Sequence, residues 1–221
     1  AYIYVPDITE EYPEARFPVL YMFDGHNVFF DEDATYGKSW GLKDYMVRTK
    51  TPLIIAAVEC NHSPNHGRLS EYSPYTFKTP ELGHIRGRGR TTMNWLVNTF
   101  KPFIDQNFPT IPDREHTFIA GSSMGGLMSL YAVLSYNRTF SRAAALSPSV
   151  WFAPQQFERL ITRARIGKDT VVYMDYGARE FSNHENMRQR FGLVATQLME
   201  RGIHLDCRIV PDGDHCEASW E

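Results

Sequence analysis

Cysteine is scarce in this chain, which has only Cys60, Cys207 and Cys216 among 221 residues. The number is odd and no C-x-x-C pair occurs, so the sequence indicates neither a disulfide framework nor a zinc site. A reducing compartment is the simplest interpretation, and we expect a cytoplasmic protein. We likewise expect no metal and no cofactor.

Long apolar runs and strong net charge are missing too. No apolar stretch approaches the roughly 18 residues that a membrane span requires, and no signal peptide is visible. The formal net charge of −3 gives no electrostatic basis for binding nucleic acid or an anionic membrane. We therefore expect a small molecule as the partner, and the sequence leaves a homo-oligomer open.

Internal repeats, low-complexity tracts and domain linkers are also absent. A chain of 221 residues with 43% hydrophobic and 22% charged residues is long enough for one sizeable α/β domain and short for two. We expect residues 1–221 to form a single domain. The one anomaly is segment 59–90, which is rich in Pro, Gly, His and Arg and is predicted to be irregular. A connection of that length inside a compact domain is usually functional.

What the chain does contain is an alternation of short apolar runs with helical patterns. The apolar runs predict strands at residues 1–5, 17–23, 53–58, 117–120, 143–146, 170–175 and 204–210. Helices are predicted after the turn at 121–125 and at residues 40–48, 92–107, 154–165 and 186–201. Ser39 is the expected N-cap of the first helix, and Pro102 predicts a kink or a second start. The alternation predicts an α/β fold, a mostly parallel central sheet with helices on both faces.

The stretch 116–131 carries the strongest functional motif. Gly121-Ser-Ser-Met-Gly125 matches G-x-S-x-G with Ser123 at its centre, between an apolar run and residues at helical spacing. A strand, a tight turn and a helix in that order expose the serine hydroxyl beside a helix N-terminus, which favours developing negative charge. The motif predicts Ser123 as a nucleophile. An ordinary Gly-rich phosphate turn is the alternative, but the lysine of a P-loop and the spacing of a dinucleotide site are lacking.

A serine nucleophile needs a base, and the base needs an acid that orients it. Among eight histidines, only His215 lies downstream of Ser123 in a loop directly after an apolar strand, so His215 is the expected base. Several carboxylates compete for the third role. We favour Glu180, which follows a glycine after the 170–175 strand, and Asp175 and Glu185 are the alternatives.

The oxyanion of a tetrahedral intermediate needs two hydrogen-bond donors. The backbone N–H of Met124, the residue after the nucleophile, is one expected donor. The other is expected in the loop after the 17–23 strand, where Gly25 lets the chain turn, and we choose the N–H of His26. Metal ligation by His26 with Asp24 is not expected.

Four stretches spread over nearly the whole chain resemble the Putative esterase family of the α/β-hydrolases: residues 18–27, 118–127, 145–151 and 213–220. Members of that family include enterochelin-esterase-like enzymes, S-formylglutathione hydrolases, feruloyl and acetyl-xylan esterases and mycolyltransferases. The resemblance implies Ser123 as nucleophile, His215 as base, an acid in the 177–180 loop and an oxyanion amide after Gly25. The family often has Asp at the acid position, where this chain offers Glu180.

The acyl-group pocket is expected to be built by Trp40, the 61–90 loop and the 147–151 loop that carries Trp151. Asn27, in the first matching stretch, is a further candidate for substrate binding. Core packing is the alternative for Trp40, and a cleft is favoured for Trp151. Three glycine-spaced arginines could hold an acidic substrate group, although a solvated basic loop is the favoured interpretation: Arg86, Arg88 and Arg90.

The sequence therefore predicts a cofactor-free serine esterase that works through an acyl-enzyme. An acyltransferase with the same three catalytic residues is one alternative, because transfer differs from hydrolysis only in the acceptor. A non-catalytic binding protein on the same fold is the other. The presence of Ser123, His215 and a candidate acid argues against it, since a degenerate site is expected to lose one of them.

Overall fold

A seven-stranded sheet of order β1-β3-β2-β6-β7-β8-β9 forms the centre of the computed structural model, which describes residues 1–7, 12–182 and 186–221. β1 runs antiparallel to β3, and all other neighbouring strands are parallel. The predicted mostly parallel sheet is confirmed. The strands are β1 (Tyr2–Tyr4), β2 (Val19–Met22), β3 (Ile54–Ala57), β6 (Thr117–Ser122), β7 (Arg142–Leu146), β8 (Val171–Gly177) and β9 (His204–Val210).

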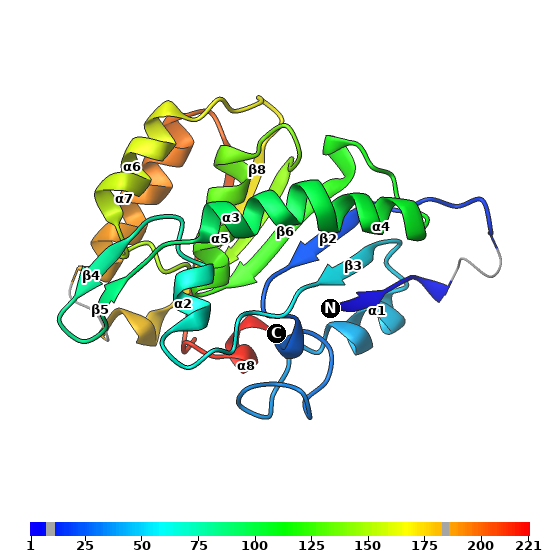
Figure 1. Ribbon diagram of the computed structural model, residues 1–221, viewed down its shortest axis with the longest axis horizontal. Helices are drawn as coiled ribbons and strands as arrows, with labels where there is room; N and C mark the ends of the chain where they lie inside the picture. The colour runs from blue at the N-terminus through cyan, green and yellow to red at the C-terminus, as the bar shows by residue number, and fades with distance from the viewer. Residues whose placement is uncertain (8–11, 183–185) are drawn as a thin grey trace.

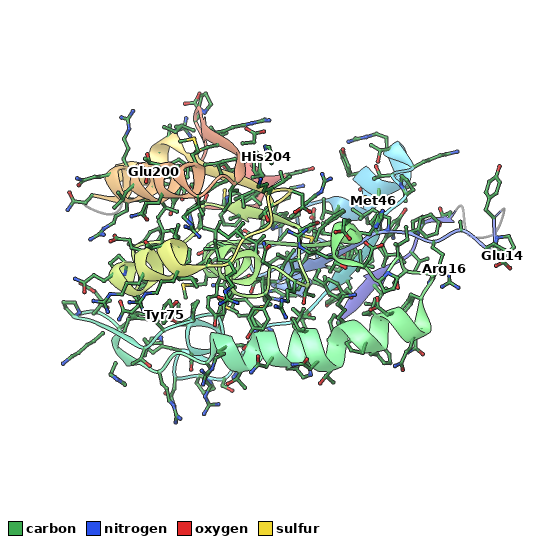
Figure 2. The ribbon with its side chains drawn as sticks, turned by 90° about the horizontal axis from the view of Figure 1, so that it is seen from above. Glu14, Arg16, Met46, Tyr75, Glu200 and His204 are labelled. Atoms are coloured by element: carbon green, nitrogen blue, oxygen red, sulfur yellow. The ribbon has the colours of Figure 1, made fainter. Side chains whose placement is uncertain are left out.

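Helices cover both faces of the sheet, but unequally. The larger core cluster joins the sheet to side chains from α2 through α7, whereas the smaller one holds Met46 of α1, with Trp40 before it and Trp220 of α8 packed against it. Figure 2 shows Met46 and α1 on the opposite side of the molecule from the long α3–α4 helix. The helices are α1 (Leu42–Thr49), α2 (Gly67–Glu71), α3 (Gly89–Trp95), α4 (Lys101–Asn107), α5 (Met124–Ser135), α6 (Pro154–Arg163), α7 (Met187–Glu200) and α8 (Glu217–Trp220).

Two predicted helices differ in detail. The 92–107 helix is α3 and α4 joined by a π-helical turn, η3 (Leu96–Phe100), and Pro102 stands at the start of α4. A proline is tolerated in the first turn of a helix, because its missing N–H needs no partner there. Ser39 is not the N-cap of α1, since Gly41 with φ of 62° precedes the helix. The Ser39 hydroxyl donates to Asp31 instead, at 2.7 Å.

The prediction that segment 59–90 is irregular is wrong in two places. It contains α2 and a two-stranded hairpin of β4 (Phe77–Thr79) and β5 (Gly83–Ile85). Both elements are too short to leave a periodic pattern. The hairpin packs through Phe77 on Phe152, with ring centroids 4.5 Å apart. Tertiary packing therefore orders the segment.

The arrows of β2, β3 and β6 point toward the side of the molecule where α2 and α8 lie (Figure 1). The loop after β2 contains the short 3-10 helix η2 (Gly25–Asn27), and η5 (Ala178–Ser182) follows β8. Parallel strands bring their carboxyl ends to one edge of a sheet, where ligands of open α/β folds bind. Segments far apart in the sequence therefore meet at this edge.

Candidate active site

Ser123 occupies the sharp turn between β6 and α5, in a conformation that few non-glycine residues adopt. Its φ is 56° and its ψ is −119°, and such strained backbone clusters at functional sites. The flanking glycines make the turn possible. A Cβ on Gly121 would lie 2.8 Å from the carbonyl carbon of Gly125, and one on Gly125 would lie 3.1 Å from Cβ of Phe23. The predicted elbow is thus present.

The hydroxyl of Ser123 lies near the unpaired N–H groups of the first turn of α5. Its Oγ is 3.4 Å from Oγ of Ser149, and the backbone oxygen of Ser123 accepts the first helical bond from Leu127 at 3.0 Å. Helix N-termini favour negative charge. An oxyanion formed next to Ser123 would be stabilised there.

His215 and Glu180 form a tight pair at the same edge. Nδ1 of His215 is 2.6 Å from Oε2 of Glu180, although 35 positions separate the two residues. Only 1% of Glu180 is exposed, whereas 35% of the His215 side chain is. Nε2 of the imidazole is therefore the nitrogen left for a substrate or nucleophile, and the buried carboxylate fixes the ring orientation.

Electrostatics keep Glu180 ionised despite its burial. Burial alone would raise the pKa of its carboxyl, but hydrogen bonds from His215, Ser147 and the backbone N–H of Gly177 outweigh burial and lower the pKa. The Ser147 hydroxyl donates at 2.6 Å and the Gly177 N–H at 2.9 Å, both to Oε1. A permanent negative charge behind the ring stabilises an imidazolium.

The structure describes one of the two alternative acids, Asp175. Asp175 accepts hydrogen bonds from the Tyr173 hydroxyl at 2.8 Å and from the Ser147 N–H at 3.2 Å. Burial raises the pKa of the Asp175 carboxyl. These contacts direct Asp175 away from the histidine that Glu180 binds. Glu185 lies outside the described residues.

The sequence analysis did not identify Trp220 of α8 as a residue that supports Glu180 through Ser147. The Ser147 hydroxyl that donates to Glu180 accepts a hydrogen bond from Nε1 of Trp220 at 2.9 Å. The Trp220 ring also packs edge-on against His215, with centroids 5.0 Å apart. Trp220 thus contacts both the imidazole and the hydroxyl that holds its carboxylate. The nearness of Trp220 to His215 in the sequence was the available signal.

The two predicted oxyanion donors lie at the ends of adjacent strands, β2 and β6. The N–H of Gly25 is already used, since it donates to the Val58 carbonyl at 2.7 Å. Within the described ranges, the N–H groups of His26 and Met124 donate to no other residue. Both amides are therefore available to a ligand.

A cavity of about 600 Å³ opens at this edge and has Ser123 and His215 in its wall. Most of its other lining residues carry a hydrogen-bonding group, and Arg68 is its arginine. Arg68 holds Asp24 through two hydrogen bonds of 2.7 Å, so the wall contains a guanidinium whose charge this carboxylate balances. The other lining residues are His26, Asn27, Thr35, Tyr36, Cys60, Asn61, His62, Ser63, His66, Gly67, Leu69, Ser122, Cys216, Glu217 and Trp220.

The aromatic residues predicted for the pocket lie elsewhere. Trp40 lines a separate hollow of about 570 Å³ and touches the cavity only through its neighbour Trp220, 6.2 Å away between ring centroids. Trp151 packs on Phe152 and Tyr176. Ring packing in the two core clusters decides these positions, and composition gives no sign of it. The described lining of the cavity contains none of the three glycine-spaced arginines.

Asn27 does line the cavity, but its side chain is committed to the protein. Its Nδ2 donates to Glu217 at 2.9 Å, and its Oδ1 accepts the Thr35 N–H at 2.9 Å. Asn27 therefore fastens α8 to the loop after β2. Metal-ligating side chains also gather in this wall, where His26, Cys60 and His62 approach one another.

Comparison with known proteins identifies the family. The model of the Putative esterase family matches residues 1–221. An uncharacterized protein of Bacillus subtilis (strain 168), YbbA, is 24% identical over 190 residues, which is 85% of this chain and 71% of that protein. None of the helices in the described ranges is long and apolar enough to cross a membrane.

Solved structures share the fold. An IroE-like serine hydrolase from Shewanella oneidensis has a TM-score of 0.75 and 20% identity, over 99% of this chain and 71% of its own. The enterobactin esterase FES from Shigella flexneri has a TM-score of 0.73 and 18% identity, over 99% of this chain and 51% of its own. The chain therefore belongs to the Putative esterase family, has the α/β-hydrolase fold, and is a carboxylic ester hydrolase.

Proposed function

We propose that Ser123 attacks the ester carbonyl and forms an acyl-enzyme, with His215 as general base and Glu180 as the acid that orients it. The hydroxyl has to leave its contact with Ser149 and donate to Nε2 of His215. Catalytic hydrogen bonds are often loose without substrate. As Ser123 attacks, His215 takes its proton, and Glu180 stabilises the imidazolium.

The intermediate carries its charge on the former carbonyl oxygen. The amides of Met124 and His26 hold that oxygen. His215 then returns the proton to the departing alcohol, and the acyl group stays on Ser123. Water attacks next, with His215 again as base, and releases the acid and the free serine.

The single observation that supports this proposal best is the 2.6 Å contact between His215 and the buried Glu180, in a cavity whose wall also holds Ser123. A buried carboxylate costs free energy unless hydrogen bonds compensate it, and Glu180 is held by His215, Ser147 and the Gly177 N–H. The strained φ of 56° at Ser123 independently indicates a functional site at the same edge of the sheet.

A small polar ester is the substrate class that the cavity favours. Its lining is rich in hydrogen-bonding side chains and holds the Arg68 cation, with Leu69 as its aliphatic residue. A long fatty acyl chain would displace water from these side chains without offering them a hydrogen bond, which costs free energy. Structural neighbours include an enterobactin esterase, so polar esters of the siderophore type are one candidate.

The test is hydrolysis of a panel of short-chain, aryl, sugar and siderophore-type esters by wild type and Ser123→Ala. Polar esters should be cleaved faster than long-chain ones, and kcat should fall at least about a thousandfold in the variant. Adding alcohol acceptors separates transfer from hydrolysis, since hydrolysis gives free acid. Undiminished cleavage by Ser123→Ala would refute the proposal.

A further inference from the structure

Beside the catalytic residues, the cavity wall holds a group of side chains that ester hydrolysis does not use. We propose that His26, Cys60 and His62 form a binding site for a thiophilic divalent cation such as Zn²⁺, and that occupation of this site slows hydrolysis. One donor atom from each of the three residues lies within 4.8 Å of the other two. Two imidazoles and a thiol are donors that zinc prefers.

A carboxylate lies beside the two imidazoles and accepts hydrogen bonds from them. Oε2 of Glu59 is 2.9 Å from Nδ1 of His26 and 3.2 Å from Nε2 of His62. The His26 and His62 rings lie edge to face, with centroids 5.1 Å apart. Two nitrogens and one sulfur from the protein leave a fourth position for water, as in zinc sites that keep one open position.

The His26 ring already has the support that metal-binding imidazoles usually have. Nε2 of His26 is 2.9 Å from the Thr35 hydroxyl, while Nδ1 contacts Glu59. Whichever nitrogen binds the metal, the other keeps a hydrogen-bond partner. Such a partner fixes the tautomer and the orientation of the ring.

Cys60 supplies selectivity for a soft metal. It is 8% exposed but belongs to the cavity wall, so an ion reaches it from solvent. Zn²⁺ displaces the thiol proton to solvent as the sulfur–metal bond forms.

Occupation would interfere with catalysis by two routes. The ion sits in the cavity that the ester enters, whose wall also holds Ser123 and His215. It also fixes the ring of His26, whose backbone N–H is the proposed oxyanion donor. This second consequence rests on the proposed function, whereas metal binding does not.

The test measures metal binding directly. ZnCl₂ is titrated against a chromophoric chelator with wild type, Cys60→Ser and His62→Ala, under a phosphine reductant. His62 is well suited because 64% of its side chain is exposed, so its replacement leaves no cavity in the core. Cys207→Ser and His84→Ala, both exposed and outside the cluster, are the matched controls. Wild type and controls should bind one equivalent, and each site variant should bind at least about tenfold more weakly.

Cobalt identifies the sulfur ligand. Co²⁺ bound to wild type should give a thiolate charge-transfer band that Cys60→Ser lacks. Saturating Zn²⁺ should slow ester hydrolysis by wild type much more than by His62→Ala. Absence of one-to-one binding, equal affinity in His62→Ala, or no thiolate band would overturn the site. Equal zinc inhibition of both proteins would overturn its effect on hydrolysis. If wild type cleaves no ester, the binding titration still decides the site.

Discussion

Two edges of the same sheet carry hydrogen-bonded polar clusters. The clusters differ in backbone strain and in the side chains that line the nearby hollow. At the amino edge, Arg114 contacts Asp169, donates to the Thr170 hydroxyl at 3.1 Å, and donates to Oδ1 of Asn137 at 3.2 Å. None of these four residues belongs to the described residues with positive φ. Arg114 also lines a hollow of about 290 Å³, whose described lining contains no histidine, serine or cysteine.

At the carboxyl edge, three residues that follow neighbouring strands have positive φ. The values are 57° at Asp24 after β2, 56° at Ser123 after β6 and 43° at Ser147 after β7. Asp24 and Ser123 line the cavity of about 600 Å³, and the Ser147 hydroxyl donates to Glu180. Ion pairing alone therefore indicates stability, whereas pairing combined with strain and an open cavity indicates function.

The largest effect that separates the edges is expected for Glu180→Gln. The amide cannot hold the imidazolium, and kcat should fall about a thousandfold or more. Asp175→Asn is the matched control, because Asp175 is a buried carboxylate of β8 that contacts Tyr173 and Ser147, and it should keep kcat within about threefold. Ester hydrolysis over a pH range measures both. A greater loss in Asp175→Asn would transfer the role of the acid to Asp175.

The next effect concerns the amino edge, where Arg114→Ala should lower stability and spare catalysis. It leaves the oxygen of Asn137 and the carboxylate of Asp169 without their partner. We expect a loss of about 2 kcal/mol in the free energy of unfolding. Urea denaturation measures the loss, and kcat of the folded variant should equal that of wild type. A fall in kcat with unchanged stability would contradict the division between edges.

A smaller effect is expected for Ser147→Ala, since Ser147 acts through Glu180. The carboxylate loses one donor, so its pKa should rise, and Trp220 loses its acceptor. We expect kcat to fall about tenfold and the acid limb of the pH profile to move to higher pH. Ser141→Ala, a buried serine that donates to the Glu115 carbonyl at the amino edge, is the control. A purely structural role would lower stability without moving the profile.

The smallest effect is expected for Glu217→Gln, which should raise the free energy of unfolding by an amount that depends on pH. Burial raises the pKa of Glu217 in the folded protein. The folded state therefore binds that proton more tightly, and stability falls as pH rises from the unfolded to the folded pKa. Glu217→Gln keeps the acceptor for Asn27 and should be more stable than wild type at pH 7. Below about pH 4 the difference should disappear in urea titrations. A difference that stays constant with pH would exclude ionisation as its cause.

Strong local signals made the strands and the elbow predictable. Apolar runs located all seven strands of the sheet within a few residues, and Gly121 and Gly125 fixed the turn because no larger residue fits. Chain order and the preceding apolar strand together selected His215 as the candidate base. The roles of these residues, and a single domain over 1–221, stay predictions.

The other features of the site depend on packing between segments that are distant in the sequence, which local patterns do not encode. Trp40 and Trp220 look alike in the sequence, but only Trp220 reaches the histidine, through a short helix that Asn27 fastens. Glu180 could be ranked above Asp175 but not separated from it, since the choice depends on where the 3-10 turn after β8 leads. The His26, Cys60 and His62 cluster lacks a ligand-spacing motif for the same reason.

The most direct measurement is covalent labelling by a fluorophosphonate, read by intact mass and peptide mapping. The account predicts one label per chain on Ser123, no label on Ser123→Ala, and labelling at least about a hundredfold slower in His215→Ala. A folded wild-type protein that takes up no label, or that takes it on another residue, would contradict the claim that His215 activates Ser123.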